Sequence, residues 1–483
     1  MRTLLTAVTL AAMVVLTILS VSTLGFFDPG DFGGILWYTV ALWALFVLAA
    51  LLVRRVPTRA AIVLIIAGSA VLSGAALAGP PSTSTDSARY AWDGIVQNGQ
   101  AQQGPVDGVS PYTYVPADDA LAPFRTSWLF PAAVNDSDGH PQCAESTRVE
   151  RTVSLPSFVV ICTTINRPQV HTIYPPGAEL YFAGVRFFVP TSAAYWPFQV
   201  AGALLAVGTS VALVLAMLRR RINPRWAVLW AWSPFVATEA VTNSHVDALA
   251  ALLLLLASLF VARGAERSAR PLTTILGGVL LGLSIAVKLV PVIGVPALLR
   301  RHPLRVAIPA VLTFALLYVP YVLATGIAVI GFLPGYLAEE GYDDGSRFAL
   351  LSVVLPGPAS IVAAGILLLV TAVLVWRRTD PANPWLGQVV MIGSTMLIVT
   401  PHYSWYALLL VPFIALSRRW EWMAVPAALT AQLLVPTLDV SRVSFALAII
   451  VVLAGLGYRT YLKRVYRYPV ASAQPVQAAP SGQ

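Results

Sequence analysis

Charged residues are scarce in this sequence, and cysteine is almost absent. Asp, Glu, Lys and Arg make up 11% of the 483 residues, apolar residues make up 57%, and only two cysteines are present. The mean hydropathy is +0.75. A typical soluble domain is about 25% charged, and so few polar side chains could not cover a soluble globule of this length. The composition excludes soluble, disordered, collagen-like and disulfide-scaffold proteins, so we expect an all-α polytopic membrane protein.

Apolar runs recur along most of the chain, and a run of about 20 residues can cross about 30 Å of hydrocarbon. They predict a bundle of roughly 12–14 transmembrane helices, although several runs are short for a full span. One short run, residues 289–299, is expected to form with the preceding run a hairpin that only dips into the bilayer. The runs cover residues 4–24, 35–53, 60–78, 195–218, 227–240, 248–262, 272–286, 289–299, 306–327, 359–376, 386–399, 406–416, 423–435 and 445–461.

Most positive charge falls at alternate connections between these runs. Twenty-two of the 31 Lys and Arg residues share one side, with three acidic residues beside them. The positive-inside rule then makes both termini cytoplasmic, and the net charge of +9 reflects topology and contact with anionic lipid rather than nucleic acid. The expected segments are three transmembrane helices (1–79), one large extracytoplasmic loop (80–190), the remaining bundle (191–467) and a disordered cytoplasmic tail (468–483).

Both cysteines, Cys143 and Cys162, lie in the large loop. An extracytoplasmic compartment is oxidising, so a disulfide between them is the expected state, with a free pair as the alternative. Cys162, which lies inside an apolar run, is expected to have no catalytic role.

The loop begins with a segment that carries several polar side chains at helical spacing. On a helix, Asp86, Arg89, Tyr90, Asp93 and Gln97 share one face. The expected position of this face is the outer membrane surface, where it would meet whatever the bilayer delivers. A solvated interfacial helix without a chemical role is the alternative.

The sequence carries a series of short motifs that resemble those of GT-C membrane glycosyltransferases. It is most similar to the bacterial polyprenyl-phosphomannose-dependent mannosyltransferases of glycosyltransferase family 87, although relatives often have two acids where this chain has Thr85 and Asp86. The motifs are Asp86-x-x-Arg89-Tyr90-x-Trp92-Asp93-Gly94, Pro111-Tyr112-x-Tyr114-x-Pro116-Ala117-Asp118, Thr172-Ile173-Tyr174-Pro175-Pro176, Ser233-Pro234 with Glu239, Asn243-Ser-His245-Val-Asp247, Val287-Lys288-Leu289-Val-Pro291 and Pro401-His402-Tyr-Ser-Trp405-Tyr406.

The resemblance implies a GT-C-like bundle that transfers a sugar from a lipid phosphate to an acceptor hydroxyl on the extracytoplasmic face. The implied reaction is transfer of mannose, with inversion, from polyprenyl-phosphate-mannose to a glycolipid, lipoglycan or other glycan. A phosphate leaving group needs little protonation, so one carboxylate acting as general base can suffice, in contrast to the carboxylate pair of glycoside hydrolases. Asp86 is the candidate base and Asp93 the reserve.

Cations are needed to stabilise the departing phosphate. Lys288 is one of only two lysines and interrupts an apolar run, which marks it as a candidate because burying an ammonium group is costly. The alternative is a lysine that snorkels to the interface. Arg89 and Arg347 are further phosphate candidates, each also consistent with a plain surface arginine.

The remaining candidates for donor or acceptor binding are polar and aromatic residues at the expected outer ends. None of the histidines shows the i, i+4 spacing of a helical zinc motif, so no cofactor is expected, and a divalent cation is unlikely though not excluded. Structural alternatives are capping by Asp247, a buried pairing of Glu239 and interfacial anchoring by Trp405. Residues 339–347 form an acidic stretch, either a lid or acceptor contact or a solvated loop. The binding candidates are Tyr90, His171, Tyr174, Glu239, His245, Asp247, His402 and Trp405.

The sequence is also consistent with two other functions. One is an arabinofuranosyltransferase of the same fold that uses polyprenyl-phosphoarabinose. The other, of a different class, is a lipid or polysaccharide transporter, which should carry related halves and paired polar groups at mid-membrane. The ionisable residues here gather instead at the outer ends, which disfavours transport.

Overall fold

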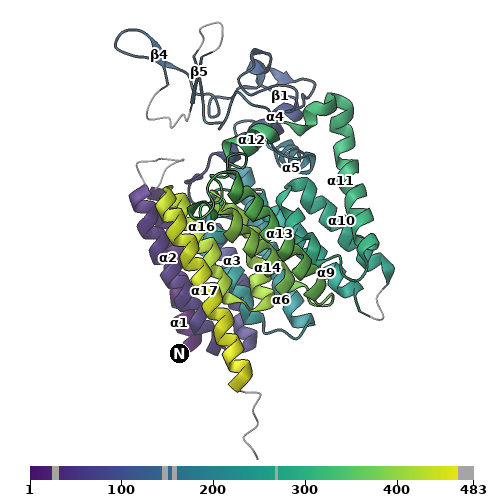
Figure 1. The fold of residues 1–483 in the computed structure, drawn as a ribbon. Helices are drawn as coiled ribbons and strands as arrows, with labels where there is room; N and C mark the ends of the chain where they lie inside the picture. Colours follow the sequence, from purple (N-terminus) through teal and green to yellow (C-terminus); the bar gives the residue numbers. More distant parts are fainter. Residues whose placement is uncertain (24–31, 144–150, 155–159, 267–269, 466–483) are drawn as a thin grey trace, which may run out of the picture.

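The computed structural model describes residues 1–23, 32–143, 151–154, 160–266 and 270–465, and the tail expected at 468–483 lies outside them. The described chain is an all-α bundle with a small cap of loops, short helices and short strands at one end (Figure 1). The predicted fold class, an all-α polytopic membrane protein, is confirmed.

Eight described helices are long and apolar enough to cross a membrane. They are α1 (Arg2–Thr23), α2 (Phe32–Leu52), α3 (Thr58–Ala75), α6 (Trp196–Arg219), α9 (Asp247–Gly264), α11 (Pro303–Thr325), α13 (Pro358–Arg378) and α17 (Leu438–Val465). Three shorter apolar helical segments lie among them, namely α10 (Pro271–Val287), α14 (Trp385–Val399) and residues Ser404–Ser417. The helix α16 (Ala424–Leu434) packs on α17.

Three of the short apolar runs do not form continuous α-helices. Residues 227–240 are divided among α7 (Val228–Ala231), α8 (Pro234–Val236) and the start of a π-helix (Ala237–Thr242). Residues 289–299 contain a 3-10 helix (Val290–Ala297), and 406–416 combine the end of another 3-10 helix (Ser404–Leu409) with α15 (Val411–Ser417). Each run contains proline, which cannot donate a backbone hydrogen bond and disfavours a regular α-helix.

The cap is built from the large loop and from the connection after α11. Its helices are α4 (Asp86–Gln97), α5 (Pro176–Phe187) and α12 (Leu333–Glu339). Its described strands form three antiparallel pairs, and Cys143 and Cys162 are joined by a disulfide. The pairs are β1 (Gln100–Ala101) with β2 (Gly104–Pro105), β3 (Val134–Asn135) with β4 (Pro141–Gln142), and β5 (Arg151–Ser154) with β6 (Val160–Thr163).

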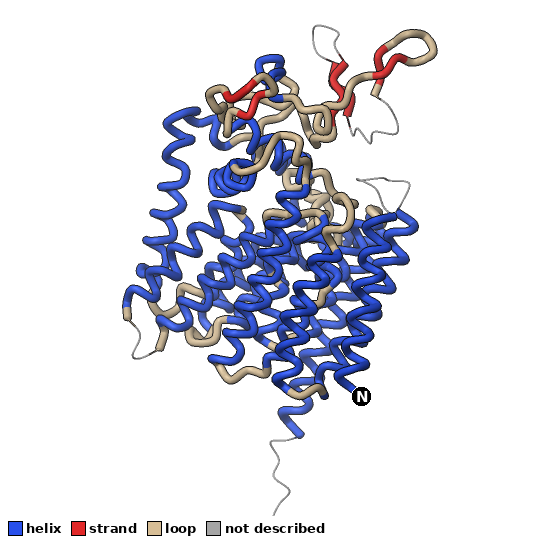
Figure 2. Tube along the Cα trace, turned by 180° about the vertical axis from the view of Figure 1, so that it is seen from behind, coloured by secondary structure: helices blue, strands red, loops and turns tan. Residues whose placement is uncertain are grey.

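The end of the bundle opposite the cap, where α1 begins and α17 ends, lies at the bottom of Figure 1, and Figure 2 shows it from behind with the N-terminus marked. The arginine-rich connections gather at this end. We call it the basic end, and the capped end the loop end. Arginines at the basic end donate hydrogen bonds to backbone carbonyls of other connections, which shows that these connections lie together. The bonds run from Arg225 to Val56, from Arg220 to Ala382, from Arg300 to Thr379 and from Arg459 to Arg418.

A cysteine-accessibility experiment tests the orientation predicted from the sequence. Gln103 is exposed in the turn between β1 and β2, and Arg301 is exposed at the basic end. A membrane-impermeant thiol reagent should label Gln103→Cys in intact cells and should label Arg301→Cys only after permeabilisation. The reverse pattern would show that the orientation is inverted.

Candidate functional site

The polar helix predicted for residues 86–97 is present as α4, and it is buried rather than solvated. Every residue from Ser87 to Val96 is buried. The Tyr90 ring stacks on Phe182 of α5 with centroids 4.3 Å apart. A Cβ atom at Gly94 would lie 2.6 Å from the Phe182 carbonyl oxygen, so glycine permits this close approach of the two helices. The packing fixes α4, and with it the position of Asp86 at its first residue.

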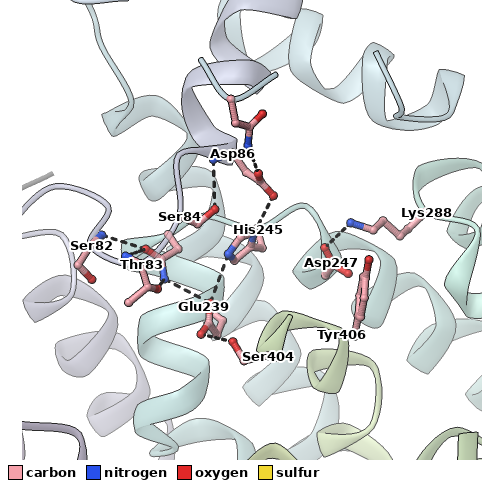
Figure 3. Close-up of polar contacts among 12 residues, drawn as sticks. Ser82, Thr83, Ser84, Asp86, Glu239, His245, Asp247, Lys288, Ser404 and Tyr406 are labelled. Atoms are coloured by element: carbon pink, nitrogen blue, oxygen red, sulfur yellow. Dashed lines mark hydrogen bonds and ion pairs between the residues drawn. The ribbon is translucent and has the colours of Figure 1, made fainter. Parts of the chain in front are cut away.

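Asp86 faces His245, which lies between two carboxylates (Figure 3). His245 Nδ1 is 3.5 Å from Asp86 Oδ2, and His245 Nε2 is 3.3 Å from Glu239 Oε2. The imidazole is fully buried and stacks on the Trp405 ring at 3.8 Å between centroids. Asn166 donates a 2.7 Å hydrogen bond to the other Asp86 oxygen. The side chain of Asp86 remains 13% exposed, so its carboxylate is the part of this group that a substrate can reach.

The backbone that carries Glu239 and His245 is irregular. Glu239 lies in the π-helix, and Ser244 adopts a left-handed conformation with φ of +52°. A single turn of π-helix and a left-handed residue other than glycine are both costly, and both occur preferentially at functional sites. The irregular backbone places the Glu239 and His245 side chains against each other.

The pKa values of Asp86 and His245 are shifted in opposite directions. Burial alone would raise the pKa of Asp86, but the contact with and charge of His245, the charge of Lys288 and the bond from Asn166 lower it to about 2. Burial alone would lower the pKa of His245, but its contacts with Asp86 and Glu239 and their charges raise it to about 9. At neutral pH the site therefore holds an aspartate carboxylate beside an imidazolium.

Lys288 lies where α10 ends and the chain passes into the 3-10 helix of residues 290–297. Its ammonium group is 3.0 Å from Asp247 Oδ2, and its side chain is 14% exposed. It also lies over the rings of Tyr174 and Tyr406, 5.5 and 5.4 Å from their centroids. Tyr174 packs edge to face on Tyr90 of α4, so the lysine lies beside the helix that carries Asp86 (Figure 3).

A third cluster joins Arg347 and His402 through Glu340. Arg347 donates to Glu340 and to His402 Nδ1, which is also 3.2 Å from Glu340 Oε2. Arg347 and Glu340 are buried, whereas the His402 side chain is 53% exposed. In the acidic stretch 339–347, Glu340 and Arg347 therefore form a buried ion pair, while Asp343 and Asp344 between them are exposed. Glu340 was not singled out in the sequence, where only its place in the acidic stretch marks it.

Arg89 and Asp93 form a buried ion pair within α4, and Arg89 also donates to the backbone carbonyl of Val170. Both Asp93 oxygens accept from Arg89 Nε at 2.9 Å, and both side chains are almost completely buried. Burial and the nearby Asp93 raise the pKa of Glu179 on α5. Arg89 is therefore not a plain surface arginine, because its buried guanidinium is engaged by Asp93. The pairing also leaves Asp93 enclosed rather than available as a reserve base.

Of the other binding candidates, some line the site and one lies apart from it. Tyr90 and Tyr174 pack edge to face at 5.2 Å, so they form part of the wall beside Lys288. His171 is exposed and apart from the contacts described above. Two residues that were not singled out, Asn243 and Ser404, donate hydrogen bonds to Glu239. Both lie within the motifs that resemble family 87, and this position is the sequence feature that could have identified them. Among the described residues, no group of three or more His, Cys, Asp and Glu side chains is arranged to hold a metal ion.

Comparison with known proteins supports the resemblance seen in the motifs. The sequence model of Glycosyltransferase family 87 matches residues 172–401, a segment that contains Glu239, His245, Lys288 and Arg347 but not Asp86. No curated protein sequence matches the chain. One similar solved structure is the crystal structure of an oligosaccharyltransferase from Archaeoglobus fulgidus complexed with zinc and sulfate. Its TM-score is 0.36 at 14% identity, with 82% of this chain and 52% of that chain covered. The chain thus spans about half the length of that protein.

The resemblance to family 87 is confirmed by this match. With the membrane-spanning helices of the bundle, it supports a multi-pass membrane glycosyltransferase.

The buried Arg89–Asp93 pair yields a prediction on stability. Arg89→Ala would leave the buried Asp93 without its charged partner, which costs about 3–5 kcal/mol, so we expect a large fall in Tm for the protein in detergent. The matched control is Arg167→Ala, which removes a half-exposed pair with Glu339 and should cost at most about 1 kcal/mol. An unchanged Tm together with a raised KM for a lipid-phosphate donor would instead assign Arg89 to phosphate binding.

Proposed function

We propose that this family-87-like membrane protein transfers mannose from a polyprenyl-phosphate-mannose donor to a hydroxyl of a cell-envelope glycolipid, lipoglycan or other glycan. The reaction takes place on the extracytoplasmic face and inverts the anomeric carbon. One observation carries the proposal: an ionised, partly exposed carboxylate, Asp86, and a partly exposed ammonium, Lys288, lie in one site at the loop end of a membrane bundle. A carboxylate can accept the acceptor's proton, and an ammonium can stabilise the phosphate that leaves.

The proposed step is a single in-line displacement. The acceptor oxygen forms a bond to the anomeric carbon, and the bond from that carbon to the phosphate oxygen breaks. The polyprenyl phosphate leaves with the electron pair, and the hydroxyl proton passes to Asp86. Because the displacement occurs once, the configuration at the anomeric carbon inverts.

A carboxylate with a pKa of about 2 is a weak base, so the order of events matters. The acceptor oxygen becomes acidic as its bond to the anomeric carbon forms, and a weak base then suffices. The phosphate also places negative charge beside Lys288. It partly neutralises the lysine charge, which then stabilises the ionised form of Asp86 less. Donor binding should therefore raise the pKa of Asp86 and make it a better base when it is needed.

Lys288 is suited to the phosphate for a related reason. Its single carboxylate partner, Asp247, leaves other ammonium hydrogens free to donate, since a lysine has three donors. The aromatic rings of Tyr174 and Tyr406 flank the ammonium and limit its contact with water. A cation held in such surroundings stabilises developing charge better than one in bulk water.

The donor assay tests the proposal directly. Purified protein in lipid should transfer radiolabelled mannose from polyprenyl-phosphomannose to a cell-envelope acceptor extract. Transfer from polyprenyl-phosphoarabinose instead would keep the mechanism and replace mannose by arabinose. Absence of transfer from either donor would contradict the proposed function.

Asp86→Asn tests the base. The substitution keeps the size of the side chain but removes the proton acceptor, so we expect kcat to fall by about 10²- to 10⁴-fold, the usual contribution of general-base catalysis. Asp439→Asn is the matched control, because Asp439 is exposed in the first turn of α17 and should leave kcat unchanged. Wild-type turnover by Asp86→Asn would remove the base assignment.

Lys288→Met tests the phosphate contact. Loss of the ammonium group should lower kcat/KM for the lipid-phosphate donor by about 10²-fold or more, as for other lost charge-stabilising donors, while Lys288→Arg should keep part of the activity. Arg301→Met at the basic end is the control for removal of a cation. A Lys288→Met enzyme with unchanged donor kinetics would show that the lysine only anchors the chain at the interface.

A further inference from the structure

We infer that Glu239 is a positioning residue that acts on Asp86 through His245, and that the two together hold the Asp86 carboxylate in one orientation. The inference rests on the proposed function, because it assigns a task to residues behind the proposed base. Neither residue then needs to touch the donor or the acceptor.

The geometry around the imidazole favours its protonated form. Both ring nitrogens of His245 face carboxylate oxygens, Asp86 on one side and Glu239 on the other. A neutral imidazole would turn a lone pair towards one of these carboxylates, whereas the imidazolium has an N–H for each. Stacking on Trp405 holds the plane of the ring, so the direction from His245 to Asp86 is fixed as well.

Glu239 is itself held by neutral donors. Ser404 donates to Glu239 Oε1 at 2.6 Å, and the Asn243 amide donates to Oε2 at 3.2 Å. The same Asn243 side chain donates to Thr83 Oγ1 and accepts from the backbone N–H of Ser82. The residues just before α4 are thereby tied to the group that faces His245, and Figure 3 shows Glu239 on the side of His245 away from Asp86.

The charged groups near His245 determine how it titrates. Asp86 at the start of α4 and Glu239 in the π-helix face its two nitrogens, while Asp247 at the start of α9 is engaged by Lys288. The 3-10 helix of residues 404–409 contributes the uncharged Trp405 to this contact. Loss of the Glu239 charge would leave one carboxylate to oppose burial, so the pKa of His245 would fall from about 9.

A small cavity provides the competing explanation for Glu239. It has a volume of about 40 Å³ and is lined by Glu239, by hydroxyl groups that include Ser82, Thr83 and Thr242, and by residues of α1, α2 and α16. Its size suits a few water molecules. If a substrate hydroxyl entered it, Glu239 would contact the substrate, and its removal would raise KM.

The experiment compares pH profiles of kcat and KM for the purified enzyme in lipid. The imidazolium is present below its pKa and is lost as the pH rises through it, so wild-type kcat should be level at neutral pH and fall above about pH 9. In Glu239→Gln this alkaline fall should move down by at least about one pH unit, with KM unchanged and kcat at about pH 8.5 reduced by about threefold or more. Glu239→Asp should restore part of the wild-type profile.

Two further variants keep the test sharp. His245→Gln should have a low kcat without the alkaline fall near pH 9, because the titrating group is gone. Glu421→Gln is the matched control: Glu421 is a buried glutamate paired with Arg459 at the basic end, so its loss should leave the alkaline fall in place. Circular dichroism and Tm establish that each variant is folded.

Each outcome decides between the possibilities. A raised KM in Glu239→Gln with an unmoved alkaline fall would place Glu239 on the substrate and overturn the inference. A wild-type profile in Glu239→Gln, or an alkaline fall near pH 9 that survives in His245→Gln, would also overturn it. Lack of transfer by the wild-type enzyme would remove the proposed function and the inference together, whereas transfer with an unmoved profile would remove the inference alone.

Discussion

An ionised side chain in an apolar bundle is stable only if an opposite charge lies beside it, because the cost of removing it from water is several kcal/mol. At the loop end this constraint is met by a series of carboxylates that each face a cation. Asp86 and Glu239 share His245, and Asp247 holds Lys288. The pairing does more than offset burial, since it fixes each charged group in one direction. The site is therefore preorganised by the same contacts that make it tolerable in the membrane.

The irregular backbone follows from this arrangement of charge. In a continuous α-helix over residues 227–247, the side chains of Glu239 and His245 would lie on different faces of the helix and could not contact each other. The π-helix and the left-handed Ser244 supply the missing rotation. Lys288 reaches the site in a comparable way, because α10 ends at the preceding residue and the chain continues as a 3-10 helix. Apolar composition was enough to place these segments in the bundle, but not to make them regular helices.

Much of this was readable from the sequence because it is encoded locally. Length and hydropathy of the runs predicted the all-α bundle, and the spacing of Asp86, Arg89 and Asp93 predicted α4. The same spacing could not show which charges would be enclosed, because burial of Arg89 and Asp93 depends on packing against α5, which begins about 80 residues later. Likewise the contact of Glu239 with Ser404 joins residues 165 positions apart. Residue type identified the candidates, whereas tertiary contacts determine which of them line the site and which are enclosed and only hold other residues in place.

Under the proposed function, an anionic donor would have to share a cation that already faces a carboxylate. Lys288 is held by one carboxylate and remains partly exposed, so a phosphate can share its ammonium without leaving Asp247 unpaired. His245 has no such freedom, since it is buried between two carboxylates and stacked on Trp405. The sharing is therefore confined to the Lys288 side of Asp86, and His245 stays as a fixed neighbour. If the proposed donor binds in this way, Asp86 gains basicity while its orientation is retained, which a symmetrical pair of mobile cations would not provide.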